Sequence, residues 1–206
     1  MRRCEMIRRE SLQYSAKELT TETLGDLERL LETHPAPGAY ECWCMYNHRT
    51  RPLLQKEKAQ HRETRAARNR IKKRELVRRD LSHGVLVYAE GGPVGWCQFG
   101  LAEELPRIDG NPGYRRLVRK GRAGGKWRIT CFVVLRKYRR RGVASFALKA
   151  ALEAIKSKGG GTVQAYPIVR WGAYQDFRGT VSMFRKLGFG VVSHYGTSNV
   201  VMRKTV

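Results

Sequence analysis

Residues 127–155 carry the strongest structural signal of the chain and read WRITCFVVLRKYRRRGVASFALKAALEAI. Their first part, residues 129–135, is an apolar run rich in β-branched and aromatic side chains, which is typical of a buried strand. A basic turn follows, and from residue 143 to residue 155 apolar side chains recur at helical spacing. The glycines at 159–161 favour a helix end. The stretch therefore predicts a strand, a tight turn and a helix.

The predicted start of this helix has the chemistry of an anion site. The first turn of a helix leaves about four backbone N–H groups without partners, and the aligned peptide dipoles place partial positive charge there. Gly142 and Ala144 let a ligand approach the backbone closely, because glycine has no side chain and alanine has a small one. The arginines directly before Gly142 add full positive charges. We therefore predict that a phosphate or pyrophosphate group binds at this turn.

The sequence RRRGVA at residues 139–144 resembles the Arg/Gln-x-x-Gly-x-Gly/Ala loop with which the GNAT superfamily of N-acetyltransferases binds the pyrophosphate of acyl-CoA. A second block, MFRKLGF at residues 183–189, is similar to the late helix of that family, which ends in Gly-Phe. The resemblance implies an α/β fold of the mixed α+β type in a single domain of residues 1–206, with residues 1–80 on the acceptor side. The implied sheet is mixed and mostly antiparallel, with helices on both faces. Its two central strands, residues 129–135 and 162–168, would splay apart into a V-shaped cleft.

The resemblance also implies acetyl-CoA as the co-substrate. The pantetheine amides would pair with the backbone of the strand, and the pyrophosphate would bind the amides of the turn that follows. The implied cofactor-binding residues are Phe132, Val133, Val134, Arg139, Arg140, Arg141, Gly142, Val143 and Ala144.

The implied reaction is N-acetyl transfer by direct attack of a neutral amine on the thioester. A strand N–H would stabilise the oxyanion, and an acid would protonate the leaving thiolate. The sequence departs from the family at this acid, because Phe184 occupies the position of the usual tyrosine and Phe177 that of a frequent asparagine. The identity of the acceptor stays open.

The candidate substitutes for the missing acid are Tyr166, Tyr174, His194 and Tyr195. Each of them also fits a packing role, because aromatic residues near strands usually pack. Protonation by solvent is the remaining alternative. Cys131 on the central strand suggests a covalent acyl-enzyme, but no base is assigned to it, and we interpret it as a buried, inert thiol.

The composition points to one domain with anionic partners. The chain has 206 residues, which is enough for a substantial core, and a formal net charge of +23. This charge favours a phosphorylated cofactor, an acidic acceptor or nucleic acid, although a solvated basic surface also explains it. A non-catalytic acyl-CoA sensor, or a basic RNA- or ribosome-associated module on the same fold, is therefore the alternative function.

The cysteines and the apolar pattern indicate a cytoplasmic location. The five cysteines are an odd, sparse set without a secretory leader, which favours free thiols in a reducing compartment. The sequence has no apolar run of membrane-spanning length, so we expect no membrane partner. A monomer and a homodimer both stay open.

Two segments before residue 80 have an unusual composition. Residues 41–48 are dense in aromatic and sulfur side chains. Cys42, Cys44 and His48 lack a second ligand pair at zinc spacing, so we expect core or cleft lining there and no metal. Residues 49–79 hold 13 Lys and Arg against three acids in a helix-forming context. Because residues 53–79 contain no aromatic side chain for base stacking, a solvated basic helix face is favoured over an RNA site.

The remaining segments complete the expected order of elements. We predict a helix over residues 20–33, a hairpin over 84–101, a strand over 162–168, a helix over 181–187 and a closing hairpin over 191–203. Residues 103–126 are polar and rich in glycine, and we expect a flexible connection near the cleft. Residues 121–126 do not match a nucleotide P-loop, because the glycine spacing is wrong and Trp127 stands where that motif needs Ser or Thr.

Overall fold

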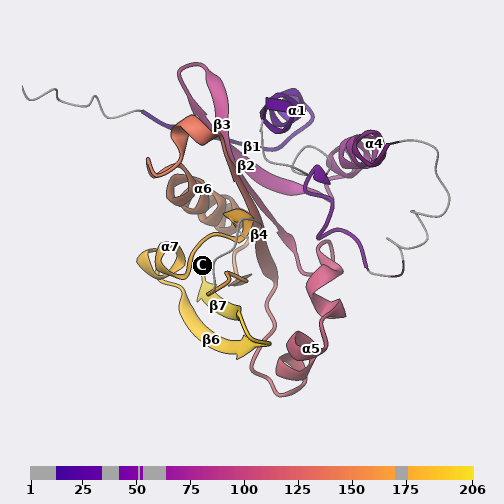
Figure 1. The fold of residues 1–206 in the computed structure, drawn as a ribbon, viewed down its shortest axis with the longest axis vertical. Helices are drawn as coiled ribbons and strands as arrows, with labels where there is room; N and C mark the ends of the chain where they lie inside the picture. Colours follow the sequence, from indigo (N-terminus) through magenta and orange to yellow (C-terminus); the bar gives the residue numbers. More distant parts are fainter. Residues whose placement is uncertain (1–12, 34–41, 51, 53–63, 170–175) are drawn as a thin grey trace, which may run out of the picture.

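The computed structural model describes residues 13–33, 42–50, 52, 64–169 and 176–206, and Figure 1 shows their arrangement. Within these residues the strands form one sheet, in the order β1-β2-β3-β4-β5-β7-β6. Neighbouring strands run antiparallel, except for the parallel pair β4 and β5. The mixed, mostly antiparallel sheet expected from the sequence is therefore confirmed. The strands are β1 (Ser15–Glu18), β2 (His83–Ala89), β3 (Gly92–Leu101), β4 (Trp127–Val134), β5 (Thr162–Ala165), β6 (Gly190–Tyr195) and β7 (Asn199–Thr205).

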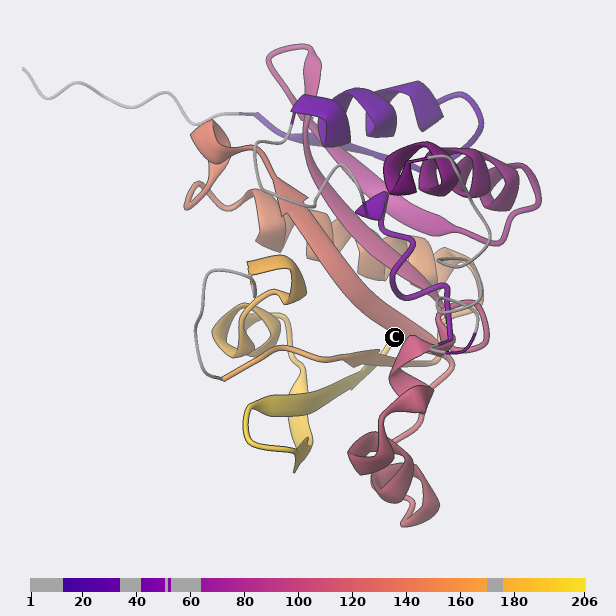
Figure 2. The same cartoon turned by 45° about the vertical axis from the view of Figure 1, so that its right-hand side comes forward.

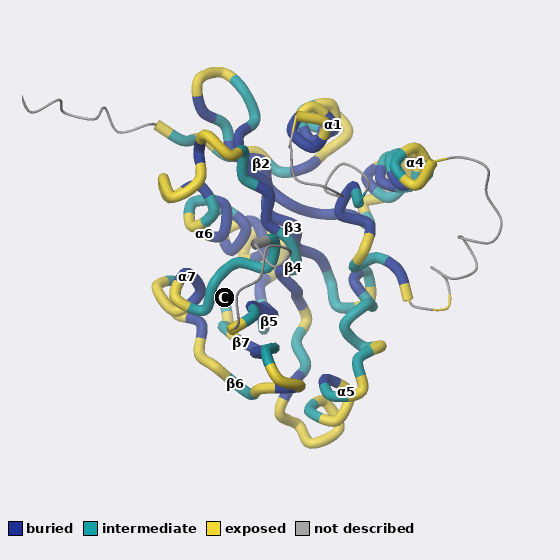
Figure 3. Tube along the Cα trace, viewed as in Figure 1, coloured by how far each residue is buried: buried dark blue, intermediate teal, exposed yellow. Residues whose placement is uncertain are grey.

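Helices cover both faces of this sheet. α1 (Leu24–Thr33) and α4 (Arg65–Arg78) lie side by side on one face, and α6 (Val143–Ser157) lies on the other (Figures 1 and 2). The strands alternate accordingly, since successive side chains of a strand point to opposite faces. On β2, Val85 and Val87 pack in the cluster that contains α6, whereas Leu86 packs in the cluster that contains α1. The central strands are thus buried on both faces, and exposed residues gather in the connections (Figure 3).

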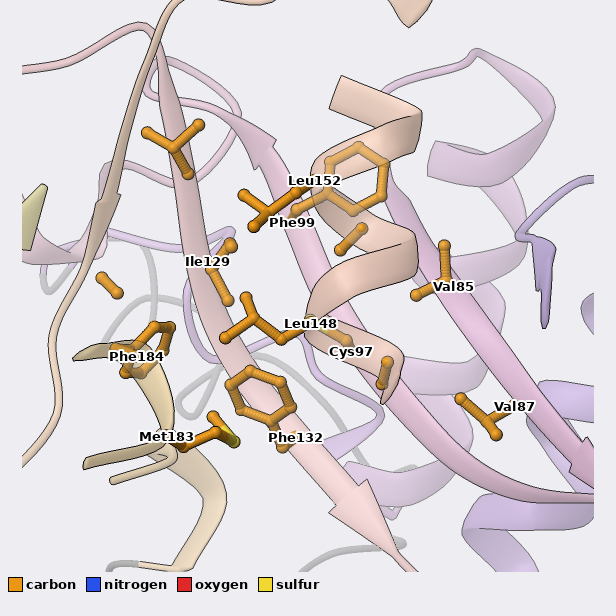
Figure 4. Packing of buried hydrophobic residues seen from close by; sticks show 14 of the residues in the cluster. Val85, Val87, Cys97, Phe99, Ile129, Phe132, Leu148, Leu152, Met183 and Phe184 are labelled. Carbon is orange, nitrogen blue, oxygen red and sulfur yellow. The ribbon is translucent and has the colours of Figure 1, made fainter. Parts of the chain in front are cut away.

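The larger core lies between α6 and the sheet. Leu148 and Leu152 of α6 face the side chains of the strands, among them Phe99 and Ile129 (Figure 4). The same cluster continues to Phe184 of α7 (Val181–Lys186), so that α7 is fixed against the end of the sheet. Burial of this apolar surface, at roughly 25 cal/mol per Å², is the main term that holds the layers together.

The strand, turn and helix predicted for residues 127–155 are present. β4 is followed by a 3-10 turn, η2 (Arg136–Tyr138), and then by α6. The hairpin predicted over residues 84–101 is formed by β2 and β3, and the closing hairpin by β6 and β7. The helix predicted over residues 20–33 begins later, at Leu24, because the Thr23 hydroxyl donates to the Glu18 carbonyl oxygen and closes a turn before it.

β4 and β5 separate soon after they begin. They pair at only three positions, from Trp127 opposite Val163 to Ile129 opposite Ala165. β4 continues to Val134, whereas β5 ends at Ala165, so the predicted strand over residues 162–168 is too long. Pro167 has no N–H to donate to a ladder, which explains the early end. The divergence of these two strands opens the sheet at its centre.

The connection between β3 and β4 is structured, contrary to the flexible link expected for residues 103–126. It contains a 3-10 helix, η1 (Pro106–Gly110), and α5 (Pro112–Arg119). Asn111 caps α5, because its side-chain oxygen accepts from the backbone N–H groups of Gly113 and Tyr114. An Asn-Pro pair is a recognised helix start, and this signal was present in the sequence.

The described part of the basic segment, α4, is more than a solvated face. Lys73 is fully buried, and its Nζ donates to the Ser82 hydroxyl at 2.8 Å. Arg70 and Arg74 both bind the buried Glu28 of α1, at 2.6 Å each. These contacts show that the expectation of a water-facing helix was wrong. α4 packs beside α1 on one face of the sheet and forms ion pairs with it. Residues 53–63 lie outside the described residues.

A helix that crosses a bilayer needs about 20 consecutive, mostly apolar residues. Among the helices of the described part of the chain, none combines this length with this apolar character.

Candidate active site

A groove of about 680 Å³ runs along the end of β4, the start of α6 and the start of α7. Its lining is apolar beside the strand and basic or hydroxylic at the helix ends. Described residues that line it are Phe132, Val134, Tyr138, Arg139, Arg140, Gly142, Val143, Ala144, Ser145, Ile168, Phe177, Gly179, Thr180, Ser182, Met183 and Lys186. No acidic side chain occurs among these described lining residues, so the groove has a positive potential suited to phosphate groups.

The start of α6 presents bare backbone N–H groups to this groove. Gly142 precedes the helix with φ of +88°, a left-handed conformation that glycine adopts without strain. Gly142 has no side chain with which to cap the helix, so the N–H groups of the first turn keep no partner from a cap. Together with the helix dipole, these donors can hold a phosphate oxygen.

Contacts from distant segments hold the turn before α6 in place. The buried Tyr138 donates its hydroxyl hydrogen bond to the Glu90 carboxylate, and Lys137 lies 3.6 Å from the same carboxylate. Tyr14 donates to the backbone carbonyl of Arg141 at 3.0 Å. The turn is thereby tied to the β2–β3 hairpin and to the chain before β1, which preorganises its amides for a ligand.

Most of the residues predicted to bind the cofactor lie in this groove. Its lining includes seven of the nine, and the two exceptions are Val133 and Arg141. The Val133 side chain packs on the opposite face of the sheet, in the cluster with α1. Val133 can therefore contact a ligand in the groove only through its backbone groups. Arg141 uses its carbonyl oxygen to bind Tyr14.

A second cavity, of about 250 Å³, lies where β5 has separated from β4. It collects residues from several separate segments of the chain. The described residues that line it are Tyr46, Asn47, Leu105, Arg107, Ile108, Gly110, Asn111, Ile129, Thr130, Tyr166, Arg178, Tyr195 and Asn199.

The groove and the second cavity adjoin each other along shared segments. On β4, Ile129 and Thr130 line the cavity, whereas Phe132 and Val134 line the groove. After β5, Tyr166 lines the cavity and Ile168 the groove, and Arg178 faces the cavity between two groove residues, Phe177 and Gly179. The two spaces therefore flank the point at which the sheet opens. A cofactor in the groove and a second molecule in the cavity would meet at β4.

Two of the predicted acid candidates, Tyr166 and Tyr195, line the second cavity and are buried. Burial raises the pKa of Tyr195 to about 12 and that of Tyr166 well above its ordinary value, so both phenols stay protonated at neutral pH. The Tyr166 hydroxyl donates to Gln164 Oε1 at 3.1 Å. The Tyr195 hydroxyl has no hydrogen-bond partner among the described residues. Tyr195 is thus the candidate whose hydroxyl proton is not engaged by another described residue.

The other two candidates are His194 and Tyr174. His194 is exposed on β6 and lines neither the groove nor the cavity. Tyr174 lies outside the described residues.

Phe184, at the position of the family's usual tyrosine, is fully buried between aromatic rings. Its ring centroid lies 6.0 Å from that of Phe132 and 5.1 Å from that of Phe189. Figure 4 shows it beside Phe132 and Met183. Phe184 therefore packs in the core and has no group that could donate a proton.

Cys44 and Cys131 contact each other, and neither residue lines the groove or the second cavity. Cys131 Sγ lies 3.5 Å from Cys44 Sγ, and this contact together with burial raises the pKa of Cys131 well above its ordinary value. Such a thiol is a poor nucleophile, as the interpretation of Cys131 as inert requires. Within the described residues, no group of three or more His, Cys, Asp or Glu side chains is arranged to hold a metal ion. His48 instead contacts Gln98 and the Glu104 carbonyl oxygen.

Several lining residues were not identified from the sequence. Arg107 and Asn111 fall in the connection that was expected to be flexible, and Arg178 falls between the strand and the helix predicted over residues 162–168 and 181–187. The helix start at Asn111 was a usable local signal. No local pattern marks Arg107 or Arg178, because both face the cavity only through the packing of distant segments.

Comparison with known proteins agrees with this geometry. The model of the acetyltransferase (GNAT) family matches residues 28–189. The N-acetyltransferase from Staphylococcus aureus Mu50 has a similar structure, with a TM-score of 0.52 at 14% identity over 94% of this chain and 98% of that chain. The PaiA N-acetyltransferase from Thermoplasma acidophilum, solved in complex with coenzyme A, has a TM-score of 0.52 at 14% identity over 95% of this chain and 100% of that chain.

A third structure, an acetyltransferase from Thermus thermophilus, has a TM-score of 0.51 at 13% identity over 95% of this chain and 99% of that chain. At these identities the likeness shows the fold. No curated protein matches the chain in sequence. The family model, in contrast, extends over more than half of the chain and includes both the turn before α6 and the end of α7. The chain therefore belongs to the acetyltransferase (GNAT) family.

Proposed function

We propose that the protein is an N-acetyltransferase that transfers the acetyl group of acetyl-CoA to an amine by direct attack. The observation that carries this proposal is the groove at the opening of the sheet, which ends at the uncapped start of α6 beside Arg139 and Arg140. The solved complex of a similar acetyltransferase with coenzyme A supports acyl-CoA as the ligand.

In the proposed complex, the acyl-pantetheine arm lies along β4, and the pyrophosphate binds the amides at the start of α6. Phe132 and Val134 supply the apolar wall for the arm. The basic residues Arg139, Arg140 and Lys186 supply charge for the phosphates. The thioester would then lie near the point where groove and cavity adjoin.

The proposed reaction forms one bond and breaks one. The neutral amine nitrogen attacks the thioester carbonyl carbon, a backbone N–H of β4 stabilises the oxyanion, and the C–S bond then breaks. The amine loses its proton to water, and the thiolate takes a proton from the Tyr195 hydroxyl or from solvent. Tyr195 is favoured over Tyr166 because its hydroxyl has no other acceptor among the described residues.

The proposal is tested by titration calorimetry with acetyl-CoA. Replacing both arginines, Arg139→Gln with Arg140→Gln, is expected to weaken acetyl-CoA binding by about tenfold or more, since each charge-assisted hydrogen bond contributes about 1.5–3 kcal/mol. Lys149→Gln is the matched control, because Lys149 is exposed on the same helix and lies outside the groove. A wild-type protein that does not bind acetyl-CoA would contradict the proposal.

A second candidate function is a non-catalytic acyl-CoA sensor. It is favoured by Phe184, which fills the position of the usual acid with a buried ring. Release of the coenzyme A thiol across a panel of amines separates the two candidates. Acetyl-CoA binding without thiol release for any amine would support the sensor. The nucleic-acid alternative has less support, because Arg70, Lys73 and Arg74 of α4 are engaged within the protein.

A further inference from the structure

The second cavity has a positively charged wall without a matching acid. Arg107 of η1 and Arg178 of η3 (Asp176–Arg178) both line it, and the remaining polar lining consists of asparagine, threonine and tyrosine side chains. No aspartate or glutamate occurs among the described residues of the lining. A cavity with uncompensated cations favours an anionic ligand group.

Arg107 is held in place by an aromatic ring and keeps donors unused. Its guanidinium carbon lies 4.4 Å from the centroid of the Tyr46 ring, and its Nη2 donates to the Tyr46 hydroxyl at 3.3 Å. Its Nη1 is buried and has no hydrogen-bond partner among the described residues. A buried donor without a partner is costly, and an anionic ligand group would offset that cost.

Among the described residues, Arg178 is oriented by one hydrogen bond to a neutral side chain. Its Nη1 donates to Asn199 Oδ1 at 3.2 Å, and both residues line the cavity. In the described part of the chain, neither Arg178 nor Arg107 lies within ion-pair distance of a carboxylate.

The nearby Arg128 shows what a neutralised arginine looks like in this region. Its Nη1 and Nη2 contact the Asp109 carboxylate at 2.8 and 2.7 Å, and Nη1 also donates to two backbone carbonyls. Arg128 does not belong to the lining. Arg128 is thus paired with a carboxylate, whereas Arg107 and Arg178 have no carboxylate partner among the described residues. This difference indicates that Arg107 and Arg178 are available to bind an anionic ligand.

The position of the cavity connects these cations to the reaction. Ile129 and Thr130 of β4 form one wall, and Phe132 and Val134 further along the strand line the cofactor groove. A molecule bound by Arg107 and Arg178 in this cavity would also contact the wall that β4 forms. The volume of about 250 Å³ is near the lower limit of typical ligand pockets, roughly 300–1,000 Å³, and admits a small molecule.

We infer that this cavity binds small amines that carry a carboxylate or a phosphate group, with the anion held by Arg107 and Arg178. The inference rests on the proposed function for the claim that the bound amine is the acetyl acceptor. The binding itself stands on the unpaired guanidinium groups and can be measured without catalysis.

Matched amines provide the test. O-phosphoethanolamine is compared with ethanolamine, and β-alanine with β-alaninamide, by titration calorimetry against the protein saturated with coenzyme A in buffered saline. Each pair shares its amino group and differs in the anion. The anionic member of at least one pair is expected to bind about tenfold or more tightly, because a bidentate arginine contact to an anion is charge-assisted. The pair with the larger ratio identifies phosphate or carboxylate as the preferred group.

Three variants test whether the preference for the anionic amine arises in the cavity. Arg107→Gln and Arg178→Gln are each expected to reduce the ratio within the pair by about tenfold while acetyl-CoA affinity stays unchanged. Arg119→Gln is the matched control, since Arg119 is an exposed arginine of α5 outside the cavity. Circular dichroism and acetyl-CoA titration report whether each variant is folded. If Arg107→Gln does not fold, Arg178→Gln alone carries the test.

Equal binding within both pairs, no binding of any of these amines at millimolar concentration, or a preference that survives both variants would overturn the inference. The outcome is separate from that of the proposed function. Acetylation of the neutral and the anionic amines at equal rates would support the acetyltransferase function and contradict the anion site. Tight binding of the anionic amines without thiol release would support the anion site and contradict the proposed acetyl transfer.

Discussion

Two tyrosines in the second cavity show how hydrogen bonding separates residues that are otherwise alike. The rings of Tyr166 and Tyr195 both contact Tyr114 in T-shaped arrangements, at 5.7 and 6.1 Å between centroids. The Tyr166 hydroxyl is committed to Gln164, whereas the Tyr195 hydroxyl has no partner in the described residues. A buried hydroxyl without a partner costs stability, and such costs are found where function requires the group.

Removing the Tyr195 hydroxyl is expected to impair the chemical step. Tyr195→Phe should lower kcat by about 100-fold, the usual scale for a lost general acid, and leave acetyl-CoA affinity unchanged. Because burial raises its pKa to about 12, Tyr195 stays protonated at neutral pH, so no alkaline loss of kcat should arise from it near neutrality. Steady-state kinetics across pH measures both effects. Tyr166→Phe is the control and should change kcat less, and an unchanged kcat in Tyr195→Phe would exclude Tyr195 as the acid.

At the scale of elements, the contact between β3 and α6 positions the turn before α6, where we propose that the pyrophosphate binds. Gly95 of β3 lies directly beneath Val143, the first residue of α6. A Cβ on Gly95 would meet Val143 Cγ1 at 2.4 Å, and Val143 is buried and β-branched, so it cannot turn aside easily. The close approach of strand and helix therefore depends on a glycine at this position.

Gly95→Ala is expected to lower the free energy of unfolding by about 1–3 kcal/mol, as overpacking in a core does. The start of α6 would shift away from β3, so acetyl-CoA affinity should fall several-fold as well. Gly92→Ala on the same strand is the control, because a Cβ there meets nothing within 4 Å, and its effect should stay within about 0.5 kcal/mol. Denaturant unfolding and calorimetry give the two values. Equal stability of the two variants would show that α6 does not need Gly95.

At the scale of the whole molecule, one carboxylate joins the layer of α1 and α4. Glu28 of α1 is buried and is bound by Arg74 and Arg70 of α4. The hydrogen bond from Arg74, with further support from Arg70 and against the opposing effect of burial, lowers the pKa of Glu28 from 4.5 to about 2. The apolar cluster beneath these helices also contains Trp96 of β3 and Val133 of β4. The ion pairs of Glu28 therefore stabilise the two helices that pack on the central strands.

The sign of the resulting pH dependence follows from the lowered pKa. The folded protein holds Glu28 ionised more strongly than the unfolded chain does, so its stabilisation is complete above pH 4.5 and is lost as the pH falls toward about 2. Glu28→Gln should therefore lower the free energy of unfolding at neutral pH by about 2 kcal/mol, since screening of the partly exposed arginines reduces the full effect. The difference from wild type should shrink toward zero in acid.

Urea unfolding from neutral pH down to the acid range measures this difference. Glu75→Gln is the control, because Glu75 and Arg79 form an exposed pair at 3.4 Å on the same chain segment, which contributes about 0.5 kcal/mol or less. A Glu28→Gln variant whose deficit is the same at every pH would show that the carboxylate charge is not what joins the two helices.

The amino-acid sequence alone determined the strand, turn and helix of residues 127–155, the flanking hairpins and the family. These features depend on local periodicity, on the glycine at 142 and on short-range motifs, which need no knowledge of distant contacts. The turn of residues 139–144 is of this kind. So is the departure at Phe184, which is visible once residues 183–189 are compared with the late helix of the family.

Only the tertiary structure decided what the second cavity contains and which charges are buried. Arg107, Arg178 and Tyr195 are far apart in sequence and come together because β4 and β5 separate after three paired positions. Lys73 looks in sequence like any other lysine of a basic helix, yet the packing of α4 on the sheet buries it. Burial and pairing are properties of the assembled layers, and a local pattern does not encode them.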